Sequence, residues 1–363
     1  MRRTGVSFAL PLAMLLIGTP SAAEPDQPPA LPATLDAGTW PSGHVQGIAV
    51  DKAGGFVYLS FTDMLVKLDL SGRVVGTLAG WSGHLGDLAF NPADGKVYGS
   101  LEYGEAQTYY IAVIDGHGID RPGMAAAASG LVRAVALPEV TRDFAASGHR
   151  YGSSGIDGVA FGPAFGRAEG PALLTVAYGI YGDVERADND HQVLLQYDIT
   201  DWAQRHARVL DENALHRDGP DQPAAKVFVR TGNTRYGVQN LAYDPTARRW
   251  LMGVYRGSKA HFPNFTLFAV EGGVSPSRGN LVGVPGASGG WEQGLLLPLA
   301  VDGLLDEASG IRGWHTKADV GIEAVGEGLF YLARNDGTRE WQSAELELMR
   351  WTGDPQQPFA PAR

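Results

Sequence analysis

The chain has 363 residues with a formal net charge of −11, and it holds 49 glycines, 22 prolines and no cysteine. Without cysteine it can form no disulfide framework, thiolate nucleophile or cysteine-based metal site. Glycine and proline are abundant, whereas charged residues make up only 19% and hydrophobic residues 44%, which indicates frequent turns around a large buried core. The acidic balance disfavours general binding to nucleic acid.

The first 23 residues have the pattern of a secretory signal peptide. Arg2 and Arg3 precede an apolar stretch from Val6 to Gly18, and Ser21-Ala22-Ala23 supplies the small residues of a cleavage site. Because no segment is long enough to span a bilayer comfortably, we expect a periplasmic or extracellular monomer without a membrane segment. Residues 24–32 are predicted to form a flexible leader, and residues 33–363 a single domain.

One apolar strand pattern occurs five times along the chain. It reads GIAVD, DLAFN, GVAFG, NLAYD and GIEAV, at residues 47–51, 87–91, 158–162, 240–244 and 321–325. A turn and a second strand follow each copy, at residues 56–61, 96–101, 173–178, 250–255 and 329–334. Third strands are predicted at residues 65–69, 111–115, 194–198, 267–271 and 345–351. Four of the units also have a predicted fourth strand, at residues 73–78, 131–137, 226–230 and 294–299.

Short antiparallel strands in repeated groups of four are typical of an all-β fold, the β-propeller. Five units are readable, and six or seven blades fit if others lie within residues 116–150, 201–225 or 273–318. The last unit lacks a fourth strand, so residues Ala33 to Trp40 are predicted to supply it from the other end of the chain and close the ring. One helix is predicted, from Asp201 to Asn213 with Thr200 as its N-cap.

The predicted topology places the starts of the first strands and the ends of the second strands on one face. Loops there would surround a concave mouth, and function is often carried by loops on a rigid scaffold. The expected mouth is rich in His, Tyr and Arg. It includes His44, His84, Ser153, Ser154, Arg235, Tyr236, Asp319, Glu102, Tyr103, Tyr255, Arg256 and the run from Tyr178 to His191.

Residues 177–198 contain the longest polar loop between paired strands. It carries Tyr178, Tyr181 and His191 together with five charged residues between positions 183 and 190. The loop is either a site or an ordinary solvated turn, and its acidic residues could also hold a structural calcium ion, although they lack the EF-hand spacing. A structural zinc ion is the other metal to be considered, and no cofactor is expected to be required.

Residues 231–244 bring Asn233, Arg235 and Tyr236 to the mouth, and the partner strand of the same hairpin ends at Tyr255 and Arg256. A nearby arginine would stabilise the phenolate form of Tyr236, which suits proton transfer. The alternative is that Tyr236 packs on a neighbouring blade and Arg256 is a surface cation. His44 and His84 each follow Ser-Gly in equivalent repeat positions. They could be ligands or bases at the mouth, but hydrogen bonding between blades is the favoured interpretation for both.

The stretches IYGDVERADNDHQVLLQYD and NTRYGVQNLAYD resemble the secreted β-propeller polysaccharide lyases, the ulvan lyases in particular. The resemblance covers about a tenth of the chain. It implies β-elimination on an anionic polysaccharide, with a His and a Tyr transferring protons and an Arg neutralising the uronate carboxylate. These roles would fall to His191, Tyr236 and Arg256, with Arg235 as the alternative arginine.

The resemblance also implies substrate-binding positions, and two departures from the family are visible. The sugar-binding residues would include Arg235, Asn233, Tyr178, Tyr181, Tyr255, Tyr103 and His84, and Trp341 could add a further sugar subsite. The family's propellers have seven blades, whereas five units are readable here. A second histidine of the family is replaced by Ser153 or Ser154.

Two other classes of function remain open from the sequence. A propeller glycoside hydrolase would use paired carboxylates near the axis, where Asp87, Asp157 and Glu323 lie on or beside first strands. A non-catalytic propeller would instead bind a glycan or a protein at the same mouth, since fold alone does not fix function.

Overall fold

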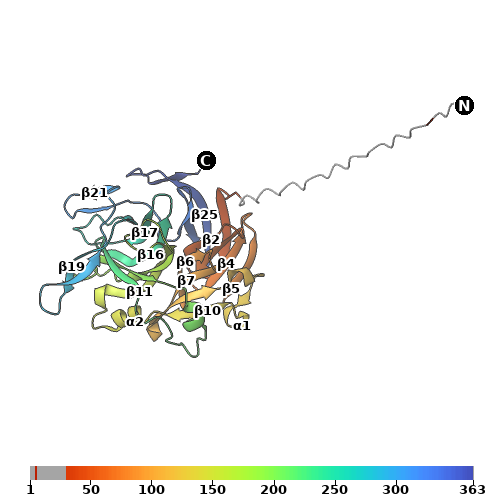
Figure 1. The fold of residues 1–363 in the computed structure, drawn as a ribbon, viewed down its shortest axis with the longest axis horizontal. Coiled ribbons are helices and arrows are strands. Elements are labelled where there is room, and N and C mark those ends of the chain that lie inside the picture. The colour runs from red at the N-terminus through yellow and green to blue at the C-terminus, as the bar shows by residue number, and fades with distance from the viewer. Residues whose placement is uncertain (1–4, 6–29, 363) are drawn as a thin grey trace.

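The computed structural model describes residue 5 and residues 30–362, which form a five-bladed β-propeller (Figure 1). The predicted signal peptide, apart from residue 5, and the part of the predicted leader before Ala30 lie outside the described residues. Within the described part of the chain, no helix is both long and apolar enough to cross a membrane.

The first three strands of each blade are antiparallel, and the first strand lies nearest the axis. Blade 1 contains β2 (Val45–Asp51), β3 (Phe56–Phe61), β4 (Met64–Asp69), β5 (Val74–Ala79) and β9 (Met124–Ala125). Blade 2 contains β6 (His84–Asn91), β7 (Lys96–Tyr103), β8 (Thr108–Ile114), β10 (Val132–Ala136) and β14 (Arg208–Val209). Blade 3 contains β11 (Ser153–Gly162), β12 (Leu173–Ile180), β13 (His191–Tyr197), β15 (Ala225–Arg230), β20 (Trp291–Leu296) and β19 (Ser277–Pro285). In contrast to the first three strands, β9 in blade 1 and β20 in blade 3 join their blades in parallel.

The last two blades complete the ring. Blade 4 contains β16 (Thr234–Asp244), β17 (Arg249–Arg256) and β18 (Leu267–Glu271). Blade 5 contains β23 (Ile322–Gly326), β24 (Leu329–Gly337), β25 (Gln342–Trp351), β1 (Thr34–Trp40) and β26 (Phe359–Pro361). The hairpin of β21 (Leu304–Asp306) and β22 (Ile311–Gly313) forms a separate small sheet next to β18.

The N-terminal strand closes the ring, as the sequence predicts. β1 pairs antiparallel with β25, with Thr34 opposite Glu347 and Trp40 opposite Gln342. Blade 5 is therefore built from segments far apart in the chain. Separation of β1 from β25 would expose the edges of both strands at once.

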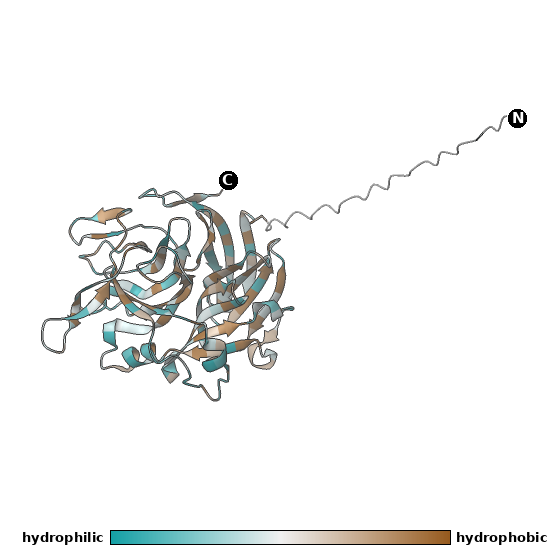
Figure 2. Ribbon diagram, in the orientation of Figure 1, coloured by the Kyte–Doolittle hydropathy of each residue, from teal (hydrophilic) through white to brown (hydrophobic). Residues whose placement is uncertain are grey.

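Five apolar clusters hold the ring together, one between each pair of neighbouring blades. The strands are therefore covered on both faces, which explains why all residues of β2, β8 and β13 are buried. Figure 2 shows the hydrophobic residues, in brown, distributed along the strands of the ring. Each large apolar side chain buried in this way contributes about 1.5–3 kcal/mol.

Glycine allows the inner strands to approach closely at the axis. A Cβ atom on Gly47 would lie 2.6 Å from the Cα of Asp87 on the next blade, and one on Gly86 would lie 2.9 Å from Oδ1 of Asp157. Part of the glycine excess therefore serves the packing of five inner strands around a narrow axis.

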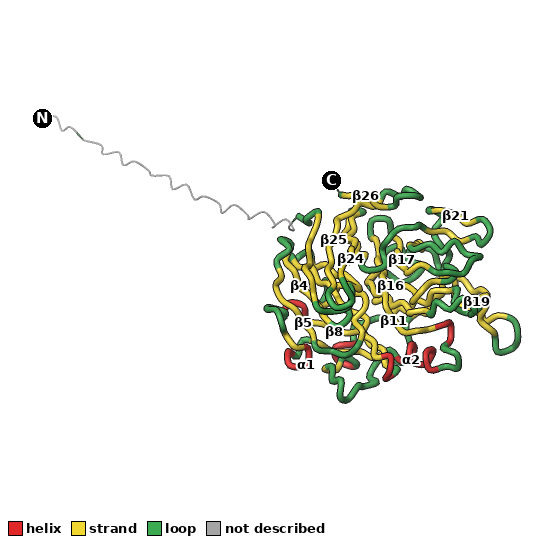
Figure 3. Tube along the Cα trace, turned by 180° about the vertical axis from the view of Figure 1, so that it is seen from behind, coloured by secondary structure: helices red, strands yellow, loops and turns green. Residues whose placement is uncertain are grey.

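The long segments that could have hidden further blades form insertions instead. They contain the short helices α1 (Ala126–Ser129), α2 (Pro138–Ala145) and α3 (Trp202–Arg205), which lie at the periphery in Figure 3. Three 3₁₀ turns occur at Gly104–Ala106, Gly116–Gly118 and Arg150–Gly152. The helix predicted from Asp201 to Asn213 is wrong beyond Arg205, because Arg208 and Val209 pair with β10 as an edge strand. The predicted N-cap, Thr200, is also wrong, because the helix begins at Trp202 with Asp201 as its N-cap.

The fourth strand predicted for blade 4 is also wrong. Residues up to Leu296 belong to β20, which pairs with β15 and β19 and so extends blade 3. In blade 4 the backbone beside β18 comes from Ala300 and Trp314, which donate hydrogen bonds to the carbonyls of Ala269 and Leu267. An apolar strand pattern predicts a strand, but it does not predict which blade that strand will join.

Candidate functional site

A cavity of about 370 Å³ opens at the axis on the predicted mouth face. The starts of the inner strands and the ends of the second strands provide its walls. Its polar side chains are His44, Gln46, His84, Glu102, Ser154, Asp157, Tyr181, Tyr236, Gln239 and Tyr255. We call this space the first cavity.

A histidine–tyrosine pair lies in the first cavity. The Tyr255 hydroxyl lies 3.3 Å from Nε2 of His44, and Nδ1 of His44 lies 2.8 Å from the carbonyl oxygen of Val45. A backbone carbonyl can only accept, so Nδ1 carries the proton and Nε2 is left as the acceptor for Tyr255. Burial, together with the negative charges of Asp319 and Asp157, raises the pKa of Tyr255. The pair therefore has a protonated phenol facing Nε2 of the His44 imidazole.

Two carboxyl groups face the same cavity. Glu102, at the end of β7, accepts a hydrogen bond from the backbone N–H of Ile156 at 3.2 Å, and burial raises its pKa to about 7. Asp157 accepts a hydrogen bond from Nε2 of Gln239 at 2.8 Å, and burial and the charge of Glu102 raise its pKa. Carboxyls that share a site in this way hold a proton near neutral pH, so one of them can act as an acid.

His84 stands next to this carboxyl pair. Its Nδ1 lies 3.8 Å from Oε1 of Glu102, while burial and the neighbouring His44 lower its pKa to about 4. His84 is therefore neutral at pH 7, and it contributes a polar wall rather than a positive charge.

The raised pKa of Glu102 predicts a pH-dependent cost to stability. Its ordinary value of 4.5 applies to the unfolded chain, so the folded state binds more protons than the unfolded state between pH 4.5 and about 7. Folding free energy is consequently lost as the pH rises through this window. We expect Glu102→Gln to be about 1–3 kcal/mol more stable than the parent at pH 8, with little gain at pH 4.

Urea denaturation of both proteins at pH 4 and pH 8 measures this difference. Glu105→Gln is the matched control, because Glu105 is exposed three residues away and should change stability equally at both pH values. An equal effect of Glu102→Gln at the two pH values would contradict the expectation.

A second cavity of about 490 Å³ adjoins the first, and the two share Tyr181 and Tyr236. Its cationic lining comes from Arg186, Arg235 and Arg256. Arg186 is already engaged by the carboxylate of Asp188 and by the carbonyl of His149. Arg235 and Arg256 are exposed, and among the described residues neither guanidinium has a carboxylate partner. Two such arginines side by side in an acidic protein form a local site for an anion.

Tyr236 separates the two cavities through an unusual backbone conformation. It has φ of +65°, and Gly237 follows with φ of +75°, within a bulge of the β16–β17 pairing. Its ring is 47% exposed and lies against Tyr255, with centroids 6.3 Å apart. The guanidinium carbon of Arg235 lies 5.7 Å from the ring centroid. Positive φ is unfavourable for a bulky residue, and such conformations concentrate at functional sites.

Six of the residues predicted for the site line one or both cavities: Tyr236, Arg256, Arg235, Tyr181, Tyr255 and His84. The other four lie elsewhere. His191 is 2% exposed at the start of β13 and borders neither cavity, and burial lowers its pKa to about 4. Since it is enclosed, His191 is misplaced for the proton transfer that the sequence assigns to it.

Tyr178, Tyr103 and Asn233 are buried in structural contacts rather than directed into the mouth. The Tyr178 hydroxyl donates to Oδ2 of Asp143 at 2.8 Å, and the Tyr103 hydroxyl donates to Oε1 of Glu212 at 2.7 Å. Oδ1 of Asn233 accepts the backbone N–H groups of Ser258 and Lys259. These three residues therefore stabilise the fold around the site.

The three carboxylates considered for a hydrolase lie in three different places. Asp157 lines the first cavity, Asp87 is 1% exposed at the axis, and Glu323 lines a different cavity at the other ends of the inner strands. Glu102 is the carboxyl that accompanies Asp157, and sequence reasoning did not give it that role. No group of three or more His, Asp or Glu side chains among the described residues is arranged to hold a metal ion. Any requirement for calcium or zinc stays untested.

His44 is the main functional candidate that the sequence undervalued. The signal was present, because His44 and His84 follow the same Ser-Gly pair in two repeats, and both line the first cavity. Repeat equivalence alone could not show that only His44 meets a tyrosine from another blade.

No family model matches the chain, and no curated protein matches it in sequence. Among solved structures it is similar to a chain of the mitotic checkpoint complex, with 10% identity over 94% of this chain and 98% of that chain and a TM-score of 0.34. It is similar to the Dos1 propeller at 11% identity, with 80% of this chain, 52% of that chain and a TM-score of 0.32. A protein of unknown function from Bacteroides caccae gives 11% identity, 63% and 78% coverage and a TM-score of 0.28. At these identities none of the three bears on activity.

Proposed function

We propose that this protein is an exported carbon–oxygen lyase that cleaves a uronate-containing polysaccharide by β-elimination. The observation that carries the proposal is the hydrogen-bonded pair of His44 and Tyr255 in the first cavity, next to the unpaired Arg235 and Arg256 of the second. This arrangement provides a proton acceptor, a proton donor and a positive charge around one mouth.

Substrate binding uses both cavities. A uronate ring occupies the first cavity, and its carboxylate extends past Tyr181 and Tyr236 toward the two arginines, because these tyrosines border both spaces. The arginines offset the carboxylate charge and stabilise the enolate that develops when the C5 proton leaves. They also let an acidic protein hold an anionic polymer.

Proton removal is assigned to Tyr255 together with His44. The Tyr255 hydroxyl passes its proton to Nε2 of His44 while its oxygen takes the proton from C5. The C5–H electron pair becomes the C4=C5 double bond, and the bond from C4 to the glycosidic oxygen breaks. Because the pKa of Tyr255 is raised, the phenol remains protonated until the substrate is in place.

The leaving oxygen needs a proton, and Glu102 is the residue assigned to give it. With a pKa of about 7 and a place in the first cavity, Glu102 is substantially protonated at neutral pH. Water then restores the proton to Glu102 and removes one from His44, so the cycle is balanced without a cofactor.

The test is incubation of the protein with several uronate-containing polysaccharides, including pectate, alginate and a sulfated uronate polymer. Elimination gives a conjugated C4=C5 double bond, which is seen as new ultraviolet absorbance. Absence of that absorbance on every polymer, with binding or reducing ends instead, would overturn the proposal.

A glycoside hydrolase is the second candidate, because Glu102 and Asp157 supply a carboxyl pair in one cavity. Hydrolysis releases reducing ends without ultraviolet absorbance. It needs one carboxyl protonated and the other ionised, which a pair that shares one proton can supply, but it gives no role to Arg235 and Arg256 in the adjoining cavity. A non-catalytic glycan-binding propeller would produce neither signal.

We expect Arg235→Ala and Arg256→Ala each to raise KM for the anionic polymer about tenfold or more, because each removes a charge-assisted contact. Initial rates measured over a range of polymer concentrations give KM at low and at high salt. The difference in KM between each variant and the parent protein should become smaller as the salt concentration rises. Arg278→Ala is the matched control, since Arg278 is exposed on β19 and lines neither cavity. An unchanged KM in both variants would show that Arg235 and Arg256 do not bind the substrate.

A further inference from the structure

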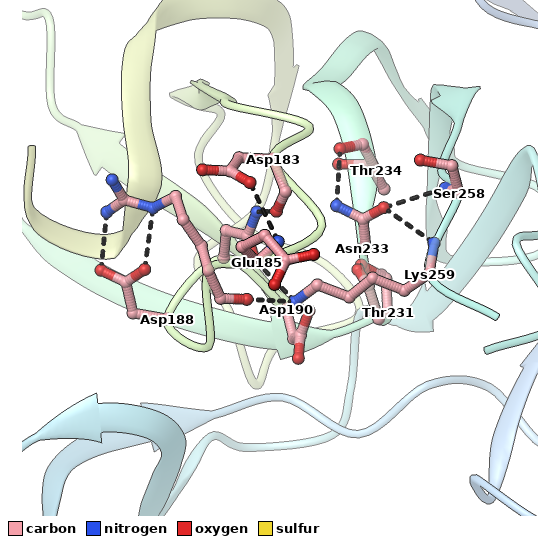
Figure 4. A network of polar contacts seen from close by, with 12 residues as sticks. Asp183, Glu185, Asp188, Asp190, Thr231, Asn233, Thr234, Ser258 and Lys259 are labelled. Atoms are coloured by element: carbon pink, nitrogen blue, oxygen red, sulfur yellow. Dashed lines mark hydrogen bonds and ion pairs between the residues drawn. The ribbon is translucent and has the colours of Figure 1, made fainter. Parts of the chain in front are cut away.

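The loop of residues 181–190, between β12 and β13, encloses a buried ammonium group. Lys259 is 5% exposed, and its Nζ donates to the carbonyl of Arg186 at 2.5 Å, to Oδ1 of Asn189 at 2.8 Å and to Oδ1 of Asp190 at 2.6 Å (Figure 4). All three acceptors belong to the loop. A buried ammonium is stable only when it is paired and hydrogen-bonded, and here each N–H has an oxygen partner.

The acceptors are a carbonyl, an amide and a carboxylate oxygen, the types of oxygen that also bind hard metal cations. The ammonium of Lys259 already occupies the position in which such an ion would neutralise the loop. Asn189 continues the network, because its Nδ2 donates to the carbonyls of Tyr181 and Asp183, each at 2.8 Å. The charge of one lysine is therefore connected to the backbone of Tyr181.

Lys259 is itself fixed to the strand that leads to the other side of the site. Its backbone N–H and that of Ser258 donate to Oδ1 of Asn233, and its carbonyl accepts from Nδ2 of Asn264 at 3.0 Å. Asn233 immediately precedes β16, which carries Arg235 and Tyr236. One residue thus joins the two halves of the second cavity.

We propose that Lys259 is a positioning residue that acts as the internal cation of the 181–190 loop and holds Tyr181 and Arg186 in place opposite Arg235. Its effect on catalysis rests on the proposed function, but its effect on the loop does not. Removal of the ammonium leaves three oxygen acceptors, one of them the carboxylate of Asp190, without a cation, so the loop opens while the rest of the propeller stays folded.

The experiment uses the full chain with Lys259→Ala, which removes three methylenes and the amine and leaves room for n-propylammonium. Trypsin cleavage after Arg186 reports loop opening, because the Arg186 side chain is held by Asp188 and by the carbonyl of His149. We expect cleavage at Arg186 to be at least tenfold faster in Lys259→Ala, and n-propylammonium in the tens of millimolar range to restore protection. Tetramethylammonium, which has no N–H group to donate, should not restore protection.

Lys67→Ala is the matched control. Lys67 is 2% exposed on β4, where it donates to the carbonyls of His117 and Ile119, far along the chain from the loop. This variant should lose stability without faster cleavage at Arg186. Asp190→Asn, which keeps the lysine and removes its anionic partner, should give an intermediate cleavage rate and covers the case in which Lys259→Ala fails to fold.

Unchanged cleavage at Arg186 in both loop variants, or acceleration at all tryptic sites alike, would overturn the positioning role, as would a lack of rescue by n-propylammonium. If elimination is detected, Lys259→Ala should raise KM more than it lowers kcat, and n-propylammonium should reverse the change. If n-propylammonium restores protection at Arg186 but the parent protein shows no elimination on any polymer, the positioning role of Lys259 is supported and the proposed function is wrong.

Discussion

Tyr255→Phe should lower kcat for elimination by about 10²–10⁴-fold while KM changes little, because the substitution removes one oxygen that transfers a proton and leaves the ring in place. The hydroxyl is the atom that contacts Nε2 of His44 at 3.3 Å. The ring packs against the rings of His44 and Tyr236, with centroids 6.4 Å and 6.3 Å apart, and phenylalanine preserves this packing. The measurement is the initial rate of ultraviolet absorbance increase over a range of polymer concentrations.

A double-mutant comparison makes this prediction specific to the pair. His44→Gln alone should cost a similar factor, and Tyr255→Phe combined with His44→Gln should cost no more than the larger single effect, since the two groups act as a unit. Tyr103→Phe is the matched control, because its hydroxyl bonds Glu212 outside both cavities.

The same series tests the tyrosine assigned from the sequence. Tyr236 lines both cavities but no hydrogen bond joins its hydroxyl to a histidine among the described residues. Tyr236→Phe should therefore reduce kcat less than tenfold. If Tyr236→Phe abolishes elimination and Tyr255→Phe does not, the proton transfer belongs to Tyr236 and not to the His44–Tyr255 pair.

The propeller was predictable because its signals are local. Each blade begins with a short apolar run followed by a turn and a second strand, and this pattern is readable within one hairpin. Ring closure by β1 followed from the missing fourth strand of the last unit. The placement of β20 was not predictable, because pairing with β15 or with β18 depends on contacts between segments about 20–70 residues apart.

The face of the propeller that carries the site was predictable from the sequence, but the side chains that line the site were not. Strand topology correctly directs Tyr236, Tyr255 and the two arginines to one mouth. Tyr178 and His191 were expected there too, but Tyr178 packs in the apolar cluster between blades 2 and 3, and His191 is enclosed at the start of β13. The proximity of Glu102 to Asp157 joins two blades, so no pattern within one blade could reveal it.

Asp87→Ala should destabilise the propeller by about 3–5 kcal/mol, because several buried N–H groups lose their acceptor at about 1–3 kcal/mol each. The carboxyl group is 1% exposed and accepts four N–H groups. These come from the backbone of Leu88 at 2.9 Å, Val159 at 3.0 Å and Leu241 at 2.9 Å, and from Nδ2 of Asn240 at 2.9 Å. The acceptor thereby ties blade 2 to blades 3 and 4, and Nδ2 of Asn240 extends the connection to the carbonyl of Gln46 in blade 1.

The repeat explains why one aspartate can serve several blades. The position of Asp87 is occupied by Gly47, Gly158 and Gly321 in three other repeats and by Asn240 in the fourth. Those small residues leave room at the axis for a single carboxylate and a single carboxamide. After Asp87→Ala, the donors of three blades face a space closed by the surrounding strands, and each buried N–H without an acceptor costs about 1–3 kcal/mol.

Urea denaturation followed by near-ultraviolet circular dichroism measures the loss, with Asp120→Ala as the control because Asp120 is exposed in a surface ion pair with Arg121. Asp87→Asn should also destabilise, since its amide N–H₂ would oppose two of the donors that the carboxylate oxygen now accepts. A loss below 1 kcal/mol in Asp87→Ala would show that the axis does not depend on this acceptor. If such a stable variant also lost activity, Asp87 would belong to the catalytic site, as the hydrolase alternative requires.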